Sequence, residues 1–188
     1  MNPINTLEAL IDRPETITGP ERPAGLGRAG LLGYFSGTLG LFMFLRMQGA
    51  VPPGVFSFLS AYLFVLAANF FFAGVIHLFM DLTCAAPSGA NGRGRAARLF
   101  LAFGCTDYLL ALLVPLGFLS GVKVLNGFLW FGLCFLAVIY ARVRLIRRLY
   151  TVSVNKALLS VWLPYGGIFL LFFAGLVYGM IWLFWLIM

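Results

Sequence analysis

Long apolar stretches, separated by short polar segments, divide the chain from about residue 29 onwards. A membrane-spanning helix needs about 20 consecutive, mainly apolar residues. The pattern predicts spans at about residues 29–45, 55–80, 98–119, 126–141 and 157–188. We therefore expect an all-α integral membrane protein, a bundle of about five transmembrane helices.

The last apolar stretch, residues 157–188, decides whether the chain has four, five or six spans. It is longer than the roughly 20 residues of one span and shorter than the roughly 40, plus a turn, that two spans need. One long helix is the preferred interpretation, and two short helices remain the alternative. Pro164, followed by Gly166 and Gly167, predicts a kink near the start of this helix.

Residues 1–28 form a separate N-terminal segment ahead of the transmembrane domain, residues 29–188. Within residues 2–13, Ile4, Leu7, Leu10 and Ile11 fall on one face of a helix, which predicts a short helix lying at the membrane surface. Residues 14–28 are rich in proline and glycine and predict an irregular linker. This segment has no apolar signal-peptide core, so we expect it to be retained.

Composition supports the membrane assignment, because 62% of the residues are hydrophobic and 10% are charged. Soluble domains carry about 25% charged residues. A net charge of +7 would suggest nucleic acid in a soluble protein. Here the basic residues flank apolar segments, which favours contact with anionic lipid headgroups and no binding of nucleic acid.

The positions of the basic residues predict the orientation of the chain. With five spans, the N-terminal segment and the second and fourth loops share one side, and they hold all 13 basic residues except Arg46 and Lys123. Basic loops remain in the cytoplasm, so the N-terminus is expected there and the C-terminus on the opposite side. The residues expected to contact lipid headgroups are Arg93, Arg95, Arg142, Arg144, Arg147 and Arg148.

Small residues recur at helical spacing in the first and last spans. Such rows allow two helix backbones to approach closely, either within one chain or between two copies in a homo-oligomer. Both alternatives stay open at this point. The residues are Gly30, Gly33, Gly37, Gly40, Gly175 and Gly179.

Asp107 is expected near the middle of the third span, where a carboxylate costs about 2.5–3.5 kcal/mol to insert. Asn69 of the second span should lie at the same depth and is the expected hydrogen-bond partner, with Thr106 and Tyr108 as further candidates. The group is either a structural polar contact between helices or a carboxylate that binds a proton or a substrate.

His77 and Asp81 are spaced by four residues and should share a helix face at the cytoplasmic end of the second span. Two ligands are too few for a metal site, so no metal and no cofactor are expected. The three cysteines have no CxxC spacing, and no catalytic motif is recognised. The pair either closes the helix end or relays protons.

Several short motifs, taken in order, resemble one known family. They are Thr6-Leu7-Glu8-Ala9-Leu10-Ile11-Asp12-Arg13-Pro14, then His77-Leu78 followed by Gly89 to Gly94, then Thr106-Asp107-Tyr108 through Pro115, and Lys156-Ala157-Leu158 leading to Leu163-Pro164. Together they resemble the Yip domain family, the Ypt/Rab-interacting membrane proteins, in their short bacterial form. The resemblance implies five spans, a cytosolic N-terminus and a place in the bacterial cytoplasmic (inner) membrane. Binding of Rab-type GTPases is not transferable, because the long cytosolic region of the eukaryotic members has no counterpart here.

The leading hypothesis is a non-enzymatic membrane-organising or scaffold protein that self-associates. The alternative is a small transporter or ion-binding protein that uses Asp107 with Asn69, and the His77/Asp81 pair. A third hypothesis is a lipid-acting enzyme at the basic face, with His77 and Asp81 as its working residues.

Overall fold

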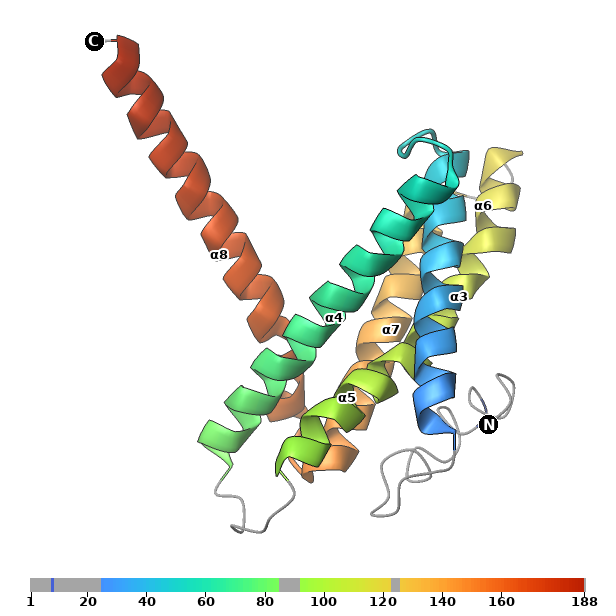
Figure 1. Cartoon of the computed structure of the whole chain (residues 1–188), viewed down its shortest axis with the longest axis vertical. Coiled ribbons are helices and arrows are strands. Elements are labelled where there is room, and N and C mark those ends of the chain that lie inside the picture. The colour runs from blue at the N-terminus through green and yellow to red at the C-terminus, as the bar shows by residue number, and fades with distance from the viewer. Residues whose placement is uncertain (1–7, 9–24, 85–91, 123–125, 188) are drawn as a thin grey trace.

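The computed structural model describes residue 8 and residues 25–84, 92–122 and 126–187 (Figure 1). Apart from residue 8, the expected surface helix at residues 2–13 lies outside the described residues, as does the linker up to residue 24. The loop before residue 92 and Lys123 also lie outside them, and so do the side chains of Arg93 and Arg95.

The described chain is helical throughout, with no strand between residues 25 and 187 in its described parts. Five of its helical segments are long and apolar enough to cross a membrane, as the hydropathy pattern predicts. The last apolar stretch is a single helix rather than two. The elements are α3 (Leu26–Met47), α4 (Val55–Thr83), α5 (Gly92–Asp107), the 3₁₀ helix η1 (Tyr108–Leu112), α6 (Leu113–Gly121), α7 (Gly127–Tyr150) and α8 (Val154–Ile187).

The glycine row of α3 packs against the third span of the same chain. Gly30 faces the backbone of Leu101, and Gly33 faces Gly104. Gly37 and Gly40 continue the row against the backbone of Asp107 and of Leu110. A Cβ atom at any of these four glycines would overlap the facing backbone. The row is therefore an intramolecular contact in which two parallel helices meet backbone to backbone.

The third span is not a continuous α-helix. Helix α5 ends at Asp107, five residues of 3₁₀ helix follow, and α6 then continues in a changed direction (Figure 1). Pro115 explains the break, because it has no N–H to donate to the carbonyl of Ala111, and its ring crowds the preceding turn. Asp107 consequently lies at the junction between two helix types.

Helix α7 begins at an Asn126 cap, whose side-chain oxygen accepts from the backbone N–H groups of Phe128 and Leu129. It continues past Ala141 to Tyr150 as one helix, and Val143, Leu145 and Ile146 are buried. The segment beyond the predicted span end at residue 141 is therefore packed into the bundle on one of its faces.

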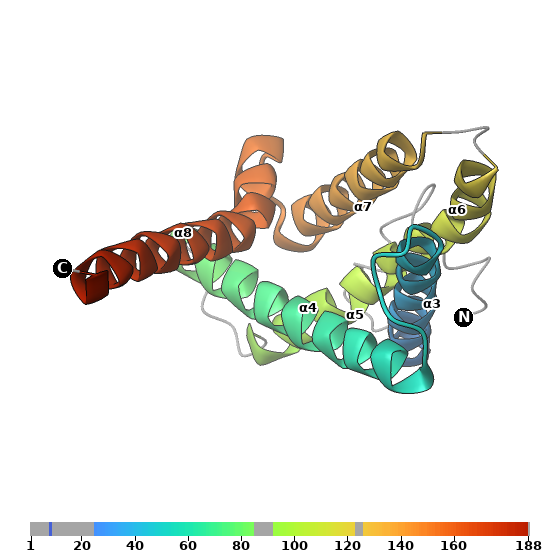
Figure 2. The ribbon, with the colours of Figure 1, turned by 90° about the horizontal axis from the view of Figure 1, so that it is seen from above.

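Helix α8 belongs to the bundle only at its start. Ala157, Ser160, Val161 and Pro164 are buried, whereas none of residues 165–187 is. Figure 2 shows the bend between the first turns of α8 and its remainder, as expected from Pro164, and Figure 1 shows the long remainder diverging from α4. The main core lies between α3, α4, α5, α7 and the first turns of α8.

We predict that Gly33→Leu destabilises the protein, because its side chain must push the α3 backbone away from Gly104. Overpacking of this kind costs about 1–3 kcal/mol. Thermal unfolding in detergent micelles should show the loss as a lower midpoint. Gly132→Leu on α7 is the matched control, since a Cβ there meets no atom within 4 Å. Equal midpoints for the two variants would contradict the close approach.

Candidate functional site

A buried polar network joins three helices at Arg142 of α7. Its Nη2 donates to Asn69 Oδ1 of α4 at 2.7 Å and to Asp107 Oδ1 of α5 at 2.7 Å. Its Nε donates to the Thr106 hydroxyl at 3.3 Å. All four residues are buried, with exposures of 0–7%. The sequence predicts a direct hydrogen bond between Asn69 and Asp107; the structure instead places Arg142 between them, bonded to both.

Each partner of Arg142 is itself held in place. The Asn69 amide donates to the carbonyl of Val65 at 2.9 Å, which turns its oxygen toward Arg142. The Thr106 hydroxyl donates to the carbonyl of Phe103 at 2.7 Å and accepts from Arg142. The guanidinium carbon lies 4.8 Å from the centre of the Phe103 ring, a distance typical of a cation–π contact.

The network is electrically balanced, because it contains one cation and one anion. An isolated charge in hydrocarbon is costly, and intramembrane charges are almost always paired inside the bundle. Charge-assisted hydrogen bonds at 2.7 Å are at the short end for N–H···O contacts. The arrangement can therefore hold α4, α5 and α7 in one relative position, and it leaves the carboxylate of Asp107 already engaged.

Tyr108 does not join the network, although the sequence makes it a candidate. Its hydroxyl is buried and has no hydrogen-bond partner among the described residues, and the same holds for Thr38 of α3. Tyr34 of α3 instead reaches the third span, where its hydroxyl donates to the carbonyl of Phe100 at 2.6 Å.

The expectation that Arg142 contacts lipid headgroups is corrected by its burial at 6% exposure and its bond to Asp107. The run of arginines suggests an interfacial helix, yet helical periodicity separates its members. Arg142 shares a face with Ile139 and Ile146, which are buried. Arg147 and Arg148 project from a different face and are exposed. The helical spacing of an arginine from the apolar residues around it therefore distinguishes the buried arginine from the exposed ones.

A second polar cluster lies where α4 ends and α7 ends. His77 Nε2 is 3.4 Å from Asp81 Oδ2, so the structure brings the predicted pair together. His77 Nδ1 is 2.9 Å from the hydroxyl of Tyr150, a partner that the sequence analysis missed. Close by, Lys156 of α8 donates to the carbonyl of Thr83 at 2.7 Å. These contacts connect the ends of α4, α7 and α8.

Chemically, the chain from Asp81 through His77 to Tyr150 can orient the imidazole ring. An ionised Asp81 accepts from Nε2–H, which leaves Nδ1 to accept from the Tyr150 hydroxyl. Among the described residues, no group of three or more His, Cys, Asp or Glu side chains is placed to hold a metal ion. The cluster thus contains the groups that a proton relay needs, and its hydrogen bonds also connect the helix ends.

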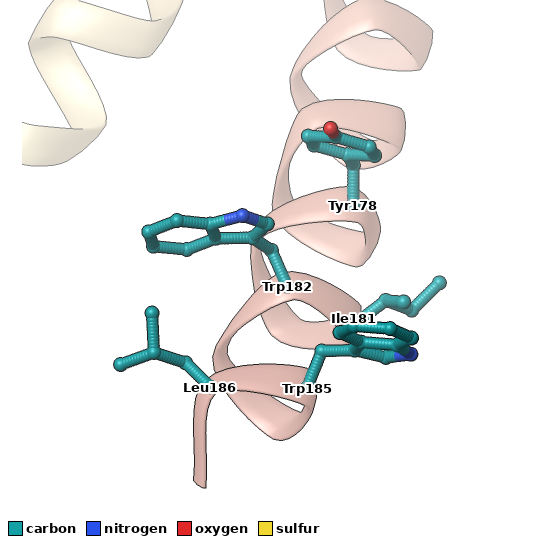
Figure 3. A pocket seen from close by; sticks show the side chains of 5 residues that line it. All are labelled: Tyr178, Ile181, Trp182, Trp185 and Leu186. Carbon is teal, nitrogen blue, oxygen red and sulfur yellow. The ribbon is translucent and has the colours of Figure 1, made fainter. Parts of the chain in front are cut away.

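The far end of α8 carries a group of large aromatic and aliphatic side chains. Figure 3 shows Tyr178, Ile181, Trp182, Trp185 and Leu186 projecting from the helix. Together they line a shallow, open hollow of about 280 Å³. Trp and Tyr prefer the membrane–water interface, where the ring sits among headgroups. Along the path of the helix, which bends at Pro164, Lys156 and Trp185 are about 44 Å apart.

Comparisons with protein-family models, with curated proteins and with solved structures find no match to this chain.

We predict that Asp107→Asn and Arg142→Met each destabilise the protein strongly, because each leaves one charge buried without its counter-charge. Breaking a buried pair from one side costs about 3–5 kcal/mol, whereas replacing both partners is close to neutral. The double variant Asp107→Asn/Arg142→Met should therefore recover most of the loss. Denaturant-induced unfolding in micelles measures all three. Simple additivity of the two single losses would show that the pair does not act as a unit.

Proposed function

We propose that this protein is a non-enzymatic membrane-organising or scaffold protein, in which a locked helical bundle holds one projecting helix for association with a second copy. The observation that carries the proposal is the exposure of α8 along residues 165–187, none of which is buried. The other four spans all contribute buried residues to the bundle. A helix long enough to span a bilayer thus extends from a bundle to which it contributes little packing.

The surface of α8 supports association through a helix–helix contact. Within lipid, helices associate by close packing, and small residues allow their backbones to approach. Gly175 and Gly179 are spaced by four residues, and a Cβ at either would meet open space in a single copy. The glycines of α3, by contrast, are already covered by the third span. Self-association is therefore assigned to α8.

The buried network supports a structural rather than a transport role for the intramembrane charges. Asp107 is bonded to Arg142 at 2.7 Å and is 2% exposed. A transport cycle that loads this carboxylate from water would have to separate the pair and open the bundle. In the scaffold proposal, the same pair keeps α4, α5 and α7 rigid, so that α8 has a fixed base.

The proposal includes an orientation in the bacterial cytoplasmic membrane, in line with the resemblance to short Yip-family proteins. Figure 1 draws the start of α3 and α5, the end of α7 and the start of α8 at one end of the molecule. Arg28, Arg98, Arg147 and Lys156 belong to these segments, and Arg46 belongs to the opposite end. Basic residues favour the cytoplasmic side, where anionic headgroups are natural partners. Rab-type GTPase binding forms no part of the proposal.

We predict that Gly175→Leu/Gly179→Leu converts an oligomer in lipid bilayers toward a monomer, because two large side chains prevent the close approach of α8 helices. Single-molecule photobleaching of the labelled full chain in dilute bilayers counts the copies. Gly132→Leu is the control, since it adds the same side chain at an open position on α7. A wild-type protein that is monomeric in bilayers would contradict the self-association part.

We further predict that liposomes containing the wild-type protein show no proton or small-ion flux above protein-free liposomes. The physical reason is that Asp107 is already paired and buried. A flux assay with an internal pH dye provides the measurement, and the double variant Asp107→Asn/Arg142→Met, which is expected to keep its stability, is the comparison. Flux in the wild type that the double variant lacks would replace the scaffold proposal by the transporter alternative.

A further inference from the structure

An apolar groove with a volume of about 480 Å³ lies between α4 and the kinked part of α8. Phe71 and Val75 line it from α4, and α8 lines it with residues between Leu159 and Leu171. All the lining residues are apolar. A volume of several hundred Å³ is within the range of sites that hold a small molecule or part of one.

The kink of α8 creates this groove. Pro164 lies inside α8, Figure 2 shows the change of direction between the two parts of the helix, and Figure 1 shows the second part diverging from α4. Gly166 and Gly167 follow directly, and a Cβ built on either meets no atom within 4 Å. The groove is wide beside Gly166 and Gly167, because these residues have no side chain and no neighbouring atom occupies the space next to them.

The depth of the groove indicates what surrounds it. Measured along the helix, Leu159 lies about 5 Å and Leu171 about 23 Å beyond Lys156. Half of the hydrocarbon core of a bilayer is about 15 Å thick. The bend at Pro164 makes the depth of the groove smaller than this path length. With Lys156 at the headgroup level, the groove then lies within the leaflet on that side, among acyl chains.

Lys156 supplies a charge at the headgroup end of the same face. Leu159 and Leu163 follow it at spacings of three and seven residues, so all three share one side of α8. The Lys156 ammonium has three donors, one of which bonds to the Thr83 carbonyl at the end of α4. That bond fixes the cation between the two helices that form the groove. Arg147 adds exposed positive charge at the end of α7, while Asp81 is the nearby negative group and lies against His77.

We propose that this groove binds one acyl chain of an anionic glycerophospholipid, whose phosphate contacts Lys156. The apolar lining matches the chain, and the cation at the headgroup end of the same helix face matches the phosphate. This lipid site is separate from Gly175 and Gly179, so it does not depend on the self-association proposed above.

Trp162 provides the probe, because it lines the groove and is 49% exposed. A full-length variant that keeps Trp162 and carries Trp130→Phe, Trp182→Phe and Trp185→Phe is placed in phosphatidylcholine bilayers. A small fraction of lipid with brominated chains is added, either phosphatidylglycerol or phosphatidylcholine. Brominated phosphatidylglycerol should quench Trp162 several-fold more than brominated phosphatidylcholine at the same mole fraction. A variant that keeps Trp185 alone should be quenched equally by both lipids.

Two substitutions separate the headgroup contact from the groove. Lys156→Gln should abolish the excess quenching by phosphatidylglycerol, and Lys156→Arg should retain it. Gly167→Leu fills the groove and should also abolish the excess, whereas Gly132→Leu, at an open glycine of α7 outside the groove, should leave it unchanged. Circular dichroism and gel filtration confirm that each variant is folded.

Four results would overturn the proposal. Equal quenching of Trp162 by the two brominated lipids would show that the groove does not prefer an anionic headgroup. If the excess quenching by phosphatidylglycerol persists in Lys156→Gln, Lys156 does not bind the phosphate. If it persists in Gly167→Leu, the lipid does not occupy this groove. Brominated phosphatidylethanolamine quenching as strongly as phosphatidylglycerol would also contradict an anionic ligand.

Discussion

The contact between Arg142 and Asp107 is the interaction on which the arrangement of the bundle depends. Lipid offers neither group a counter-charge or a hydrogen bond, so each stabilises the folded chain only while the other is present. The pair joins α5 to α7, and Asn69 brings α4 to the same guanidinium. These bonds fix the positions of the three helices relative to one another along the membrane normal. Directional polar contacts define such positions more strictly than apolar packing does.

The backbone around Asp107 is shaped to allow this contact. Gly37 of α3 lies against the Asp107 backbone with no side chain between them. Directly after Asp107 the helix changes to 3₁₀ geometry, ahead of Pro115. A 3₁₀ turn rotates successive side chains differently from an α-helical turn. The glycine row, the helix break and the charge pair therefore belong to one local arrangement around Asp107. Helix α3 packs against the backbone of Asp107, and α7 faces its carboxylate.

Much of this could be predicted from the sequence, and the limits have physical reasons. Span number followed from hydropathy, because lipid enforces the length of a helix more strictly than water does. Asn69 and Asp107 were placed at one depth by counting residues along two antiparallel helices. The burial of Arg142 was missed, because a cluster of arginines at a span end normally marks the interface. Which face a residue takes depends on packing between helices. Pro164 predicts the bend in α8, but the direction that the helix takes after the bend depends on packing.

The contrast between the two parts of α8 carries the functional argument furthest. Its first turns place Ala157, Ser160 and Val161 in the core, and Lys156 bonds to the end of α4. Its remainder leaves the bundle at Pro164, and none of residues 165–187 is buried. Within a bilayer an apolar helix loses little by standing alone, since lipid chains solvate it as well as leucine does. In the role proposed above, a base formed by α4, α5 and α7 and held by the charge pair carries this exposed helix for contact with a second copy.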